Sequence, residues 1–171
     1  MATRIIPGFV PPACAVAQPH RGSICFEIPG PPQGKARPRV VRAKNGMSMT
    51  YTPDKTVAYE ELVRLRYKAA AQGFRFPDDA QLAIQITSFY PVPKSKSKRA
   101  QSDMLAGVIR PTKKPDCDNI VKIICDALNE LAYKDDAQIV VTQMSKYYGK
   151  VPKTLVKIKS GAAPRCATPE E

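Results

Sequence analysis

Carboxylates are concentrated in one stretch of the chain, KPDCDNIVKIICDALNELAYKDDAQIVV, which runs from Lys114 to Val141. Six of the 15 acidic residues fall within the 21 positions from Asp116 to Asp136. The whole chain is nevertheless basic, with a formal net charge of +12. Carboxylates this close repel one another unless a cation neutralises them. A divalent metal ion is the natural counter-charge.

The candidate metal ligands are two pairs of aspartates that flank a helical pattern. Asp116 and Asp118 stand where that helix begins, and Asp135 and Asp136 stand at the entrance to a strand. Oxygen ligands suit Mg²⁺ or Mn²⁺ rather than zinc, and Mg²⁺ is commonly held by a few carboxylates and a substrate phosphate. Lys122, one turn beyond Asp118, can stabilise negative charge that develops on a phosphate. These residues predict a metal-dependent nuclease or phosphotransferase that acts on nucleic acid.

Each of these residues also has an ordinary structural interpretation. Asp118 can cap the helix, Lys122 can be a solvated surface residue, and residues 135–136 can form a turn before a strand. An EF-hand loop also begins Asp-x-Asp, but Ile120 stands at the next ligand position and no loop glycine follows, which argues against calcium. The combination of the two aspartate pairs favours the metal site.

The composition is that of a soluble globular protein with one ordinary domain: 171 residues, 43% hydrophobic and 25% charged. The single histidine, His20, argues against mechanisms that need a positioned imidazole. The five cysteines form no CxxC pair, which argues against zinc and favours free thiols in a reducing cytoplasm. No run of about 18 apolar residues exists, so no membrane span is expected.

Basic residues cluster in three segments, and the net charge favours a polyanionic partner such as DNA. The alternative is that they lie on solvated loops. As phosphate contacts they would position DNA without reading its bases. The predicted DNA-binding residues are Lys35, Arg37, Arg39, Lys94, Lys96, Lys98, Arg99, Arg110, Lys113 and Lys114.

The domain is expected over residues 23–159, between a leader (1–22) and a tail (160–171) that we expect to be flexible. The sequence predicts strands at 23–28, 81–90, 138–147 and 151–159, with Gly149-Lys150 between the last two. Residues 40–51 predict a hairpin that turns at Asn45-Gly46. The middle of residues 94–114 is a weak helical pattern.

Two longer helices are expected. One begins at Thr52-Pro53-Asp54, with a capping hydroxyl and a proline at the first helical position. Its apolar face is predicted to hold Ala58, Leu62, Leu65 and Ala69. The other begins near Asn119, and its core-facing stripe is predicted to hold Ile120, Ile123, Ile124, Ala127, Leu128 and Leu131. Asp118 and Lys122 then face away from the core.

The acidic stretch closely resembles the signature of the RusA family of Holliday junction resolvases. The shared features are Asp-x-Asp-Asn, a lysine four residues after the second aspartate, Asp-Ala-Leu-Asn, and Asp-Asp-x-Gln-Ile. FEIPGPPQGKARPR and YTPDKTVAYEE are similar to that family's first strand, basic loop and first helix, so the resemblance covers roughly residues 24–158. Cys117 stands where an aliphatic residue is expected, and Glu130 where a glycine is common. Neither departure removes a catalytic group.

The resemblance implies an α+β fold in which a small mixed sheet of about four to five strands is flanked by helices. It also implies a cytoplasmic, homodimeric endodeoxyribonuclease that uses Mg²⁺, or Mn²⁺ in its place, to cut four-way DNA junctions by paired, symmetric nicks. Asp116, Asp118 and Asp136 match the family's catalytic metal ligands, Lys122 matches its catalytic lysine, and Asp135 is a supporting or alternative ligand. A twofold dimer suits a junction of near twofold symmetry.

Two other functions stay open at this point. The chain can be a non-catalytic DNA-binding module that keeps the fold, although a binder would gain affinity by losing the four aspartates. It can also be a broader nuclease that cuts flaps or replication forks, which only a comparison of substrates separates from a junction resolvase.

Overall fold

The structure is a computed structural model that describes residues 22–37, 39–42 and 48–161. The elements run in the order β1 (Ser23–Pro29), β2 (Arg39–Arg42), β3 (Ser48–Tyr51), α1 (Asp54–Ala71), β4 (Leu82–Pro91), α2 (Lys98–Leu105), α3 (Cys117–Leu128), the short 3-10 helix η1 (Asp136–Gln138), β5 (Ile139–Gly149) and β6 (Lys153–Ser160). The predicted leader and tail lie almost entirely outside the described residues, as does the Asn45-Gly46 turn.

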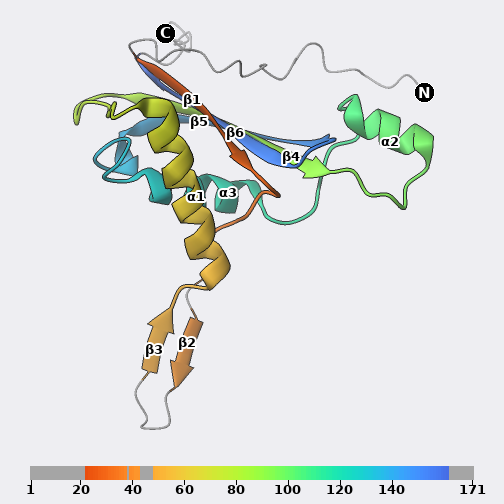
Figure 1. Ribbon diagram of the computed structural model, residues 1–171, viewed down its shortest axis with the longest axis horizontal. Coiled ribbons are helices and arrows are strands. Elements are labelled where there is room, and N and C mark those ends of the chain that lie inside the picture. Colours follow the sequence, from red (N-terminus) through yellow and green to blue (C-terminus); the bar gives the residue numbers. More distant parts are fainter. Residues whose placement is uncertain (1–21, 38, 43–47, 162–171) are drawn as a thin grey trace, which may run out of the picture.

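Four strands form one mixed sheet in the order β1-β6-β4-β5 (Figure 1). Strand β6 is antiparallel to both β1 and β4, whereas β5 is parallel to β4. A parallel pair needs a long crossover connection, and α2 and α3 lie in the connection between β4 and β5. The α+β fold with a small mixed sheet is therefore confirmed.

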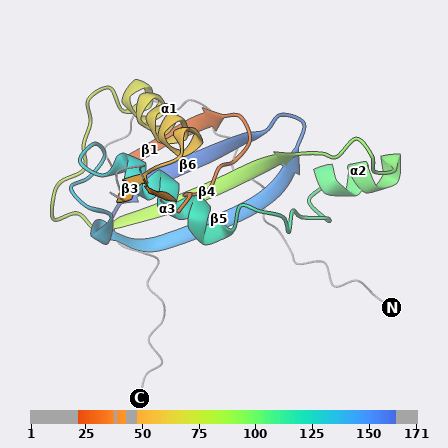
Figure 2. The same ribbon diagram turned by 90° about the horizontal axis from the view of Figure 1, so that it is seen from below.

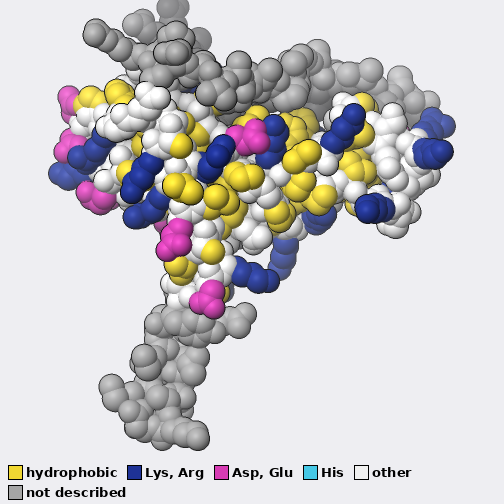
Figure 3. Space-filling view, in the orientation of Figure 1, with side chains coloured by type: hydrophobic (Ala, Val, Ile, Leu, Met, Phe, Trp, Pro, Cys, Tyr) yellow, Lys and Arg dark blue, Asp and Glu magenta, His cyan; other side chains and the backbone are white. Residues whose placement is uncertain are grey.

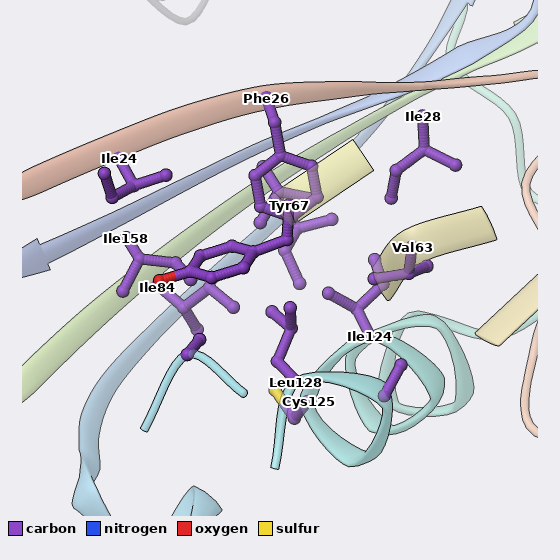
Figure 4. Close-up of a cluster of buried hydrophobic side chains, with 14 of the residues drawn as sticks. Ile24, Phe26, Ile28, Val63, Tyr67, Ile84, Ile124, Cys125, Leu128 and Ile158 are labelled. Atoms are coloured by element: carbon purple, nitrogen blue, oxygen red, sulfur yellow. The ribbon is translucent and has the colours of Figure 1, made fainter. Parts of the chain in front are cut away.

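Helices α1 and α3 lie side by side on one face of the sheet (Figure 2). Between them and the sheet, Tyr67 is 1% exposed and meets Phe26 edge to face, with ring centroids 5.7 Å apart (Figure 4). Its hydroxyl donates a hydrogen bond to the Phe74 carbonyl oxygen at 3.0 Å. The predicted stripe of α3 is confirmed from Ile120 to Leu128, and Leu131, beyond the helix, is partly buried.

Helix α1 buries a different face from the one predicted. Leu65 is 63% exposed, Ala58 and Ala69 are exposed, and Leu62 is only partly buried. The buried residues are Thr56, Tyr59, Val63, Tyr67 and Ala71. A tyrosine ring removes more apolar surface from water than an alanine side chain does. The face with two tyrosines is therefore the one that packs against the sheet.

The beginning of α1 also differs from the prediction. Pro53 occupies the N-cap position rather than the first helical position, and no side chain caps the helix, so the Thr52 hydroxyl has no capping role. Strands β2 and β3 pair antiparallel just before this point. They project from the body as a two-stranded arm below α1 (Figure 1), which confirms the predicted hairpin.

Three details of the chain bear on the earlier expectations. Cys117 and Cys125 are free thiols, but Cys25 is in a disulfide, so the expectation of free thiols is wrong for Cys25. Glu130 has a φ of +61°, the left-handed region that favours glycine. None of the helices in the described part of the chain combines the length and the apolar character needed to cross a bilayer.

Candidate active site and nucleic-acid interface

Asp116 and Asp118 lie at the beginning of α3 with both side chains exposed. Asp116 occupies the N-cap position in an extended conformation, and neither it nor any other side chain caps the helix. The capping role considered for Asp118 is therefore not observed. Lys122 is exposed one turn further along. Two carboxylates and a lysine thus face solvent, and no hydrogen bond or ion pair engages their side chains within the described part of the chain.

A pocket of about 330 Å³ adjoins Asp116. The loop after β1 forms one wall, because the Lys35 amide donates a hydrogen bond to the Asn119 carbonyl oxygen at 2.9 Å. A Cβ atom at Gly34 would lie 2.8 Å from the Pro115 Cβ atom. Only glycine allows this close approach of the loop to the beginning of α3.

Asp135 and Asp136 lie beyond the other end of α3. The Asp135 carboxylate accepts a hydrogen bond from the Ala137 amide at 2.8 Å. Partial burial, and then the negative charges of Asp135 and Asp126, raise the pKa of Asp136 above its ordinary value. Asp126 comes from the last turn of α3, so three carboxylates interact at this end of the helix.

The two groups of carboxylates lie at opposite ends of α3. The Tyr90 hydroxyl, at the end of β4, donates to the Pro115 carbonyl oxygen at 3.3 Å. Gln138, beside Asp136, donates instead to the Pro77 and Ala80 carbonyl oxygens, which precede β4.

The 12 residues of α3 span about 18 Å. Within the described part of the chain, no three His, Cys, Asp or Glu side chains form a group that could hold a metal ion. The convergence of Asp116, Asp118 and Asp136 on one ion stays a prediction.

Lys35 differs from the other basic residues because its ammonium is engaged inside the chain. Its Nζ atom lies 2.5 Å from Glu60 Oε1 on α1 and 3.0 Å from Asp126 Oδ2 on α3, and all three side chains are only about a quarter exposed. Burial lowers the pKa of Lys35, but its hydrogen bonds to Glu60 and Asp126 outweigh this and raise it. Lys35 therefore ties the loop to both helices, whereas we expected it to contact phosphate.

The other predicted basic residues are exposed wherever the structure describes their side chains. The side chains of Lys94, Lys96, Lys98 and Arg99 are exposed around α2, and Figure 3 shows basic side chains gathered at that end. Arg37, Lys113 and Lys114 are also exposed. The Arg110 guanidinium lies 3.9 Å from the Tyr147 ring centroid. For Arg39 the structure describes only the backbone, in β2.

Three residues that support the site were not predicted from the sequence. Lys146 donates hydrogen bonds to the Lys113 and Pro115 carbonyl oxygens at 2.8 and 3.0 Å, so that β5 holds the segment before Asp116. Asp126 and Glu60 bind Lys35. For Asp126 a signal was available, since it lies one turn beyond Lys122 on the same side of the helix. The roles of Lys146 and Glu60 depend on contacts between distant segments.

Asp116, Asp118 and Lys122 are thus exposed on one helix, and exposed basic side chains lie before it in the chain. The chain matches the family described as endodeoxyribonuclease RusA over residues 29–159. It is also 35% identical over 142 residues to the uncharacterized protein YqaN of Bacillus subtilis (strain 168), covering 82% of this chain and 98% of that protein. The chain belongs to the RusA family of endodeoxyribonucleases, which confirms the resemblance seen in the sequence.

Replacing Lys35 by methionine should destabilise the fold. The variant keeps an apolar stem but leaves the Glu60 and Asp126 carboxylates without their partner, which should lower the free energy of unfolding in urea by about 1–3 kcal/mol. Lys94→Met is the matched control, because Lys94 is exposed and makes no ion pair in the described part of the chain. An equal loss in both variants would contradict the bridging role.

Asp136→Asn should stabilise the fold at neutral pH. The pKa of Asp136 in the folded chain is above its ordinary value of 3.8. Ionisation of this group therefore costs stability as the pH rises through the folded-state pKa. The variant lacks that cost, so its melting temperature should exceed the parent's at neutral pH, and the difference should vanish below about pH 4.

The control for this prediction is Glu61→Gln, which removes an exposed carboxylate from α1 and reports the effect of net charge alone. A lower melting temperature for Asp136→Asn at neutral pH would show that its carboxylate makes stabilising contacts instead.

Proposed function

We propose that the chain is a cytoplasmic, Mg²⁺-dependent endodeoxyribonuclease that resolves four-way DNA junctions by paired, symmetric nicks, in recombination and repair. The observation that carries this proposal is the intact Asp116-x-Asp118 pair with Lys122 exposed beside it, in a chain of the RusA family. A DNA-binding module without catalysis would gain nothing from exposed carboxylates that do not cap the helix, because they would repel the DNA backbone.

The residues fit a divalent cation in donor chemistry and in electrostatics. Asp116, Asp118 and Asp136 supply the oxygen ligands that Mg²⁺ and Mn²⁺ prefer, and Asp135 is a supporting or alternative ligand. Partial burial, and then the negative charges of Asp135 and Asp126, raise the pKa of Asp136, and a cation bound beside it would favour the ionised carboxylate. When bound, the ion polarises the phosphodiester and lowers the pKa of an attacking water. Lys122 stabilises negative charge on the phosphate.

A homodimer accounts for the separation of the two carboxylate groups. Asp116 and Asp118 lie at one end of α3 and Asp136 beyond the other. A twofold axis can bring one end of α3 in one chain next to the opposite end in its partner. Each metal site would then draw ligands from both chains, and the two sites would face the two opposed strands of a junction.

The basic residues hold the DNA backbone in this proposal. Those around α2, those from Arg110 to Lys114, and Arg37 with Arg39 contact phosphates. Lys35 contributes by fixing the loop that carries Arg37, because its own ammonium is already paired.

The test of function is a comparison of DNA substrates. The parent should place symmetric nicks in a synthetic four-way junction only when Mg²⁺ or Mn²⁺ is present. Asp118→Asn should bind the junction normally without cutting it, and Glu61→Gln should cut as the parent does. Equal cutting of linear duplex would refute junction selectivity, and preference for forks or flaps would favour the broader nuclease. Cutting by Asp118→Asn at the parental rate would refute the site.

A second prediction tests the shared sites. Asp118→Asn and Asp136→Asn should each be inactive as pure dimers, yet their mixed dimer, isolated with two affinity tags, should nick one strand. The mixed dimer would contain one intact site and one doubly altered site. If each site lay within a single chain, no intact site would exist in the mixed dimer and no nick would appear.

A further inference from the structure

Strand β5 forms one edge of the sheet (Figure 2). It pairs with β4 on one side, and no strand in the described part of the chain pairs with its other side. None of its 11 residues is buried, whereas β1, β4 and β6 each contain buried residues. Val140 is 55% exposed, and Thr142 and Gln143 are exposed as well. A long, exposed edge strand presents backbone groups that can pair with another strand.

The two ends of β5 differ in their surroundings. At its far end, the connection between α2 and α3 contacts the strand, because Lys146 donates hydrogen bonds to the Lys113 and Pro115 carbonyl oxygens. At its near end, the ladder with β4 is irregular around Val140. The regular segment between these points is therefore 141–145.

This segment has the sequence VTQMS, which contains no charged residue and no proline. Natural edge strands commonly use charges or prolines to prevent pairing with another strand. The other edge of this sheet follows that rule, since β1 is only seven residues long and contains Glu27 and Pro29. The middle of β5 is thus the edge that is left open to pairing.

The charge of the chain favours a second copy of the same chain as the occupant of this edge. Two copies that each carry a net charge of +12 repel one another over most of their surfaces. An uncharged segment allows their closest approach at the least cost in repulsion. An antiparallel pair of identical strands also has a twofold axis at its centre, as a closed homodimer requires.

We propose that the chain dimerises by antiparallel pairing of β5 with β5 of its partner, about a twofold axis at Gln143. Val141 then pairs with the partner's Ser145, Thr142 with the partner's Met144, and Gln143 with its own copy. A glutamine amide both donates and accepts hydrogen bonds, so the two Gln143 side chains can bond to each other across the axis.

This pairing places carboxylates of the two chains at the same end of β5. Asp136 precedes Gln143 by seven residues, so the axis carries the partner's Asp136 toward the far end of the strand. Tyr148 lies there and pairs with Tyr90, whose hydroxyl donates to the Pro115 carbonyl oxygen at 3.3 Å. The partner's Asp136 thereby approaches the end of α3 that carries Asp116. The assignment rests on the proposed homodimeric nuclease and identifies the surface that builds its shared sites.

Sedimentation equilibrium of the full chain, without DNA or metal, tests this interface. Gln143→Lys and Gln143→Glu each place like charges opposite one another, so each should raise the dimer dissociation constant by roughly tenfold at low salt. An equimolar mixture of the two variants should recover the parental value, because Lys then faces Glu. The recovery also shows that both variants fold. Gln72→Lys and Gln72→Glu, at the exposed C-cap of α1, are the matched controls and should dimerise as the parent does.

The opposite charges of the two variants separate direct contact from an effect of net charge. Net charge alone would make Gln143→Glu dimerise more tightly than the parent, and that result would overturn the proposal. A parent that stays monomeric, or a mixture no tighter than its components, would overturn it too. The nuclease proposal fails separately, if a parent that follows this series leaves four-way junctions uncut in Mg²⁺.

Discussion

The burial of one face of α3 is the constraint on which the rest of the site depends. Ile120, Ile123, Ile124 and Leu128 are fully buried, and each contributes about 1.5–3 kcal/mol by leaving water. Turning the helix by one residue would move these side chains into solvent and carry charged ones toward the sheet. The rotation of α3 is therefore fixed, and Asp118 and Lys122 must face outward whatever their mutual electrostatics.

The loop after β1 is fixed by a different combination of forces. Gly34 lets the backbone approach Pro115 closely, and the Lys35 amide bonds to Asn119. The Lys35 ammonium then forms an ion pair with one carboxylate from each helix. Glu60 and Asp126 would repel each other without it, so this lysine also supports the packing of α1 on α3.

The sequence predicted an element and its buried face correctly where a single strong local pattern was present. The isoleucines of α3 and the alternating residues of β4 predicted both elements correctly. Burial of these apolar faces contributes more free energy than the local backbone preferences of the residues do. Helix α1 has both an aliphatic and an aromatic face that could be buried. The face with Tyr59 and Tyr67 is the one that packs against the sheet. The partners of Lys35 could not be predicted, since Glu60 and Asp126 are 25 and 91 positions away along the chain. The separation of Asp118 from Asp136 depends on the position of η1 relative to α3, which no local sequence pattern predicts.

The distribution of charge explains how a chain with a net charge of +12 can tolerate an acidic site that must approach DNA. The carboxylates are divided between the two ends of α3, and the positive charge at one of those ends is provided by Lys35, which is not free to bind phosphate. Exposed cations lie elsewhere, around α2, before Asp116 and at Arg37. In the proposed function, the basic side chains attract the DNA, and the aspartates with Lys122 carry out its cleavage. In the proposed function, a cation bound there would remove the repulsion between these carboxylates and the DNA backbone.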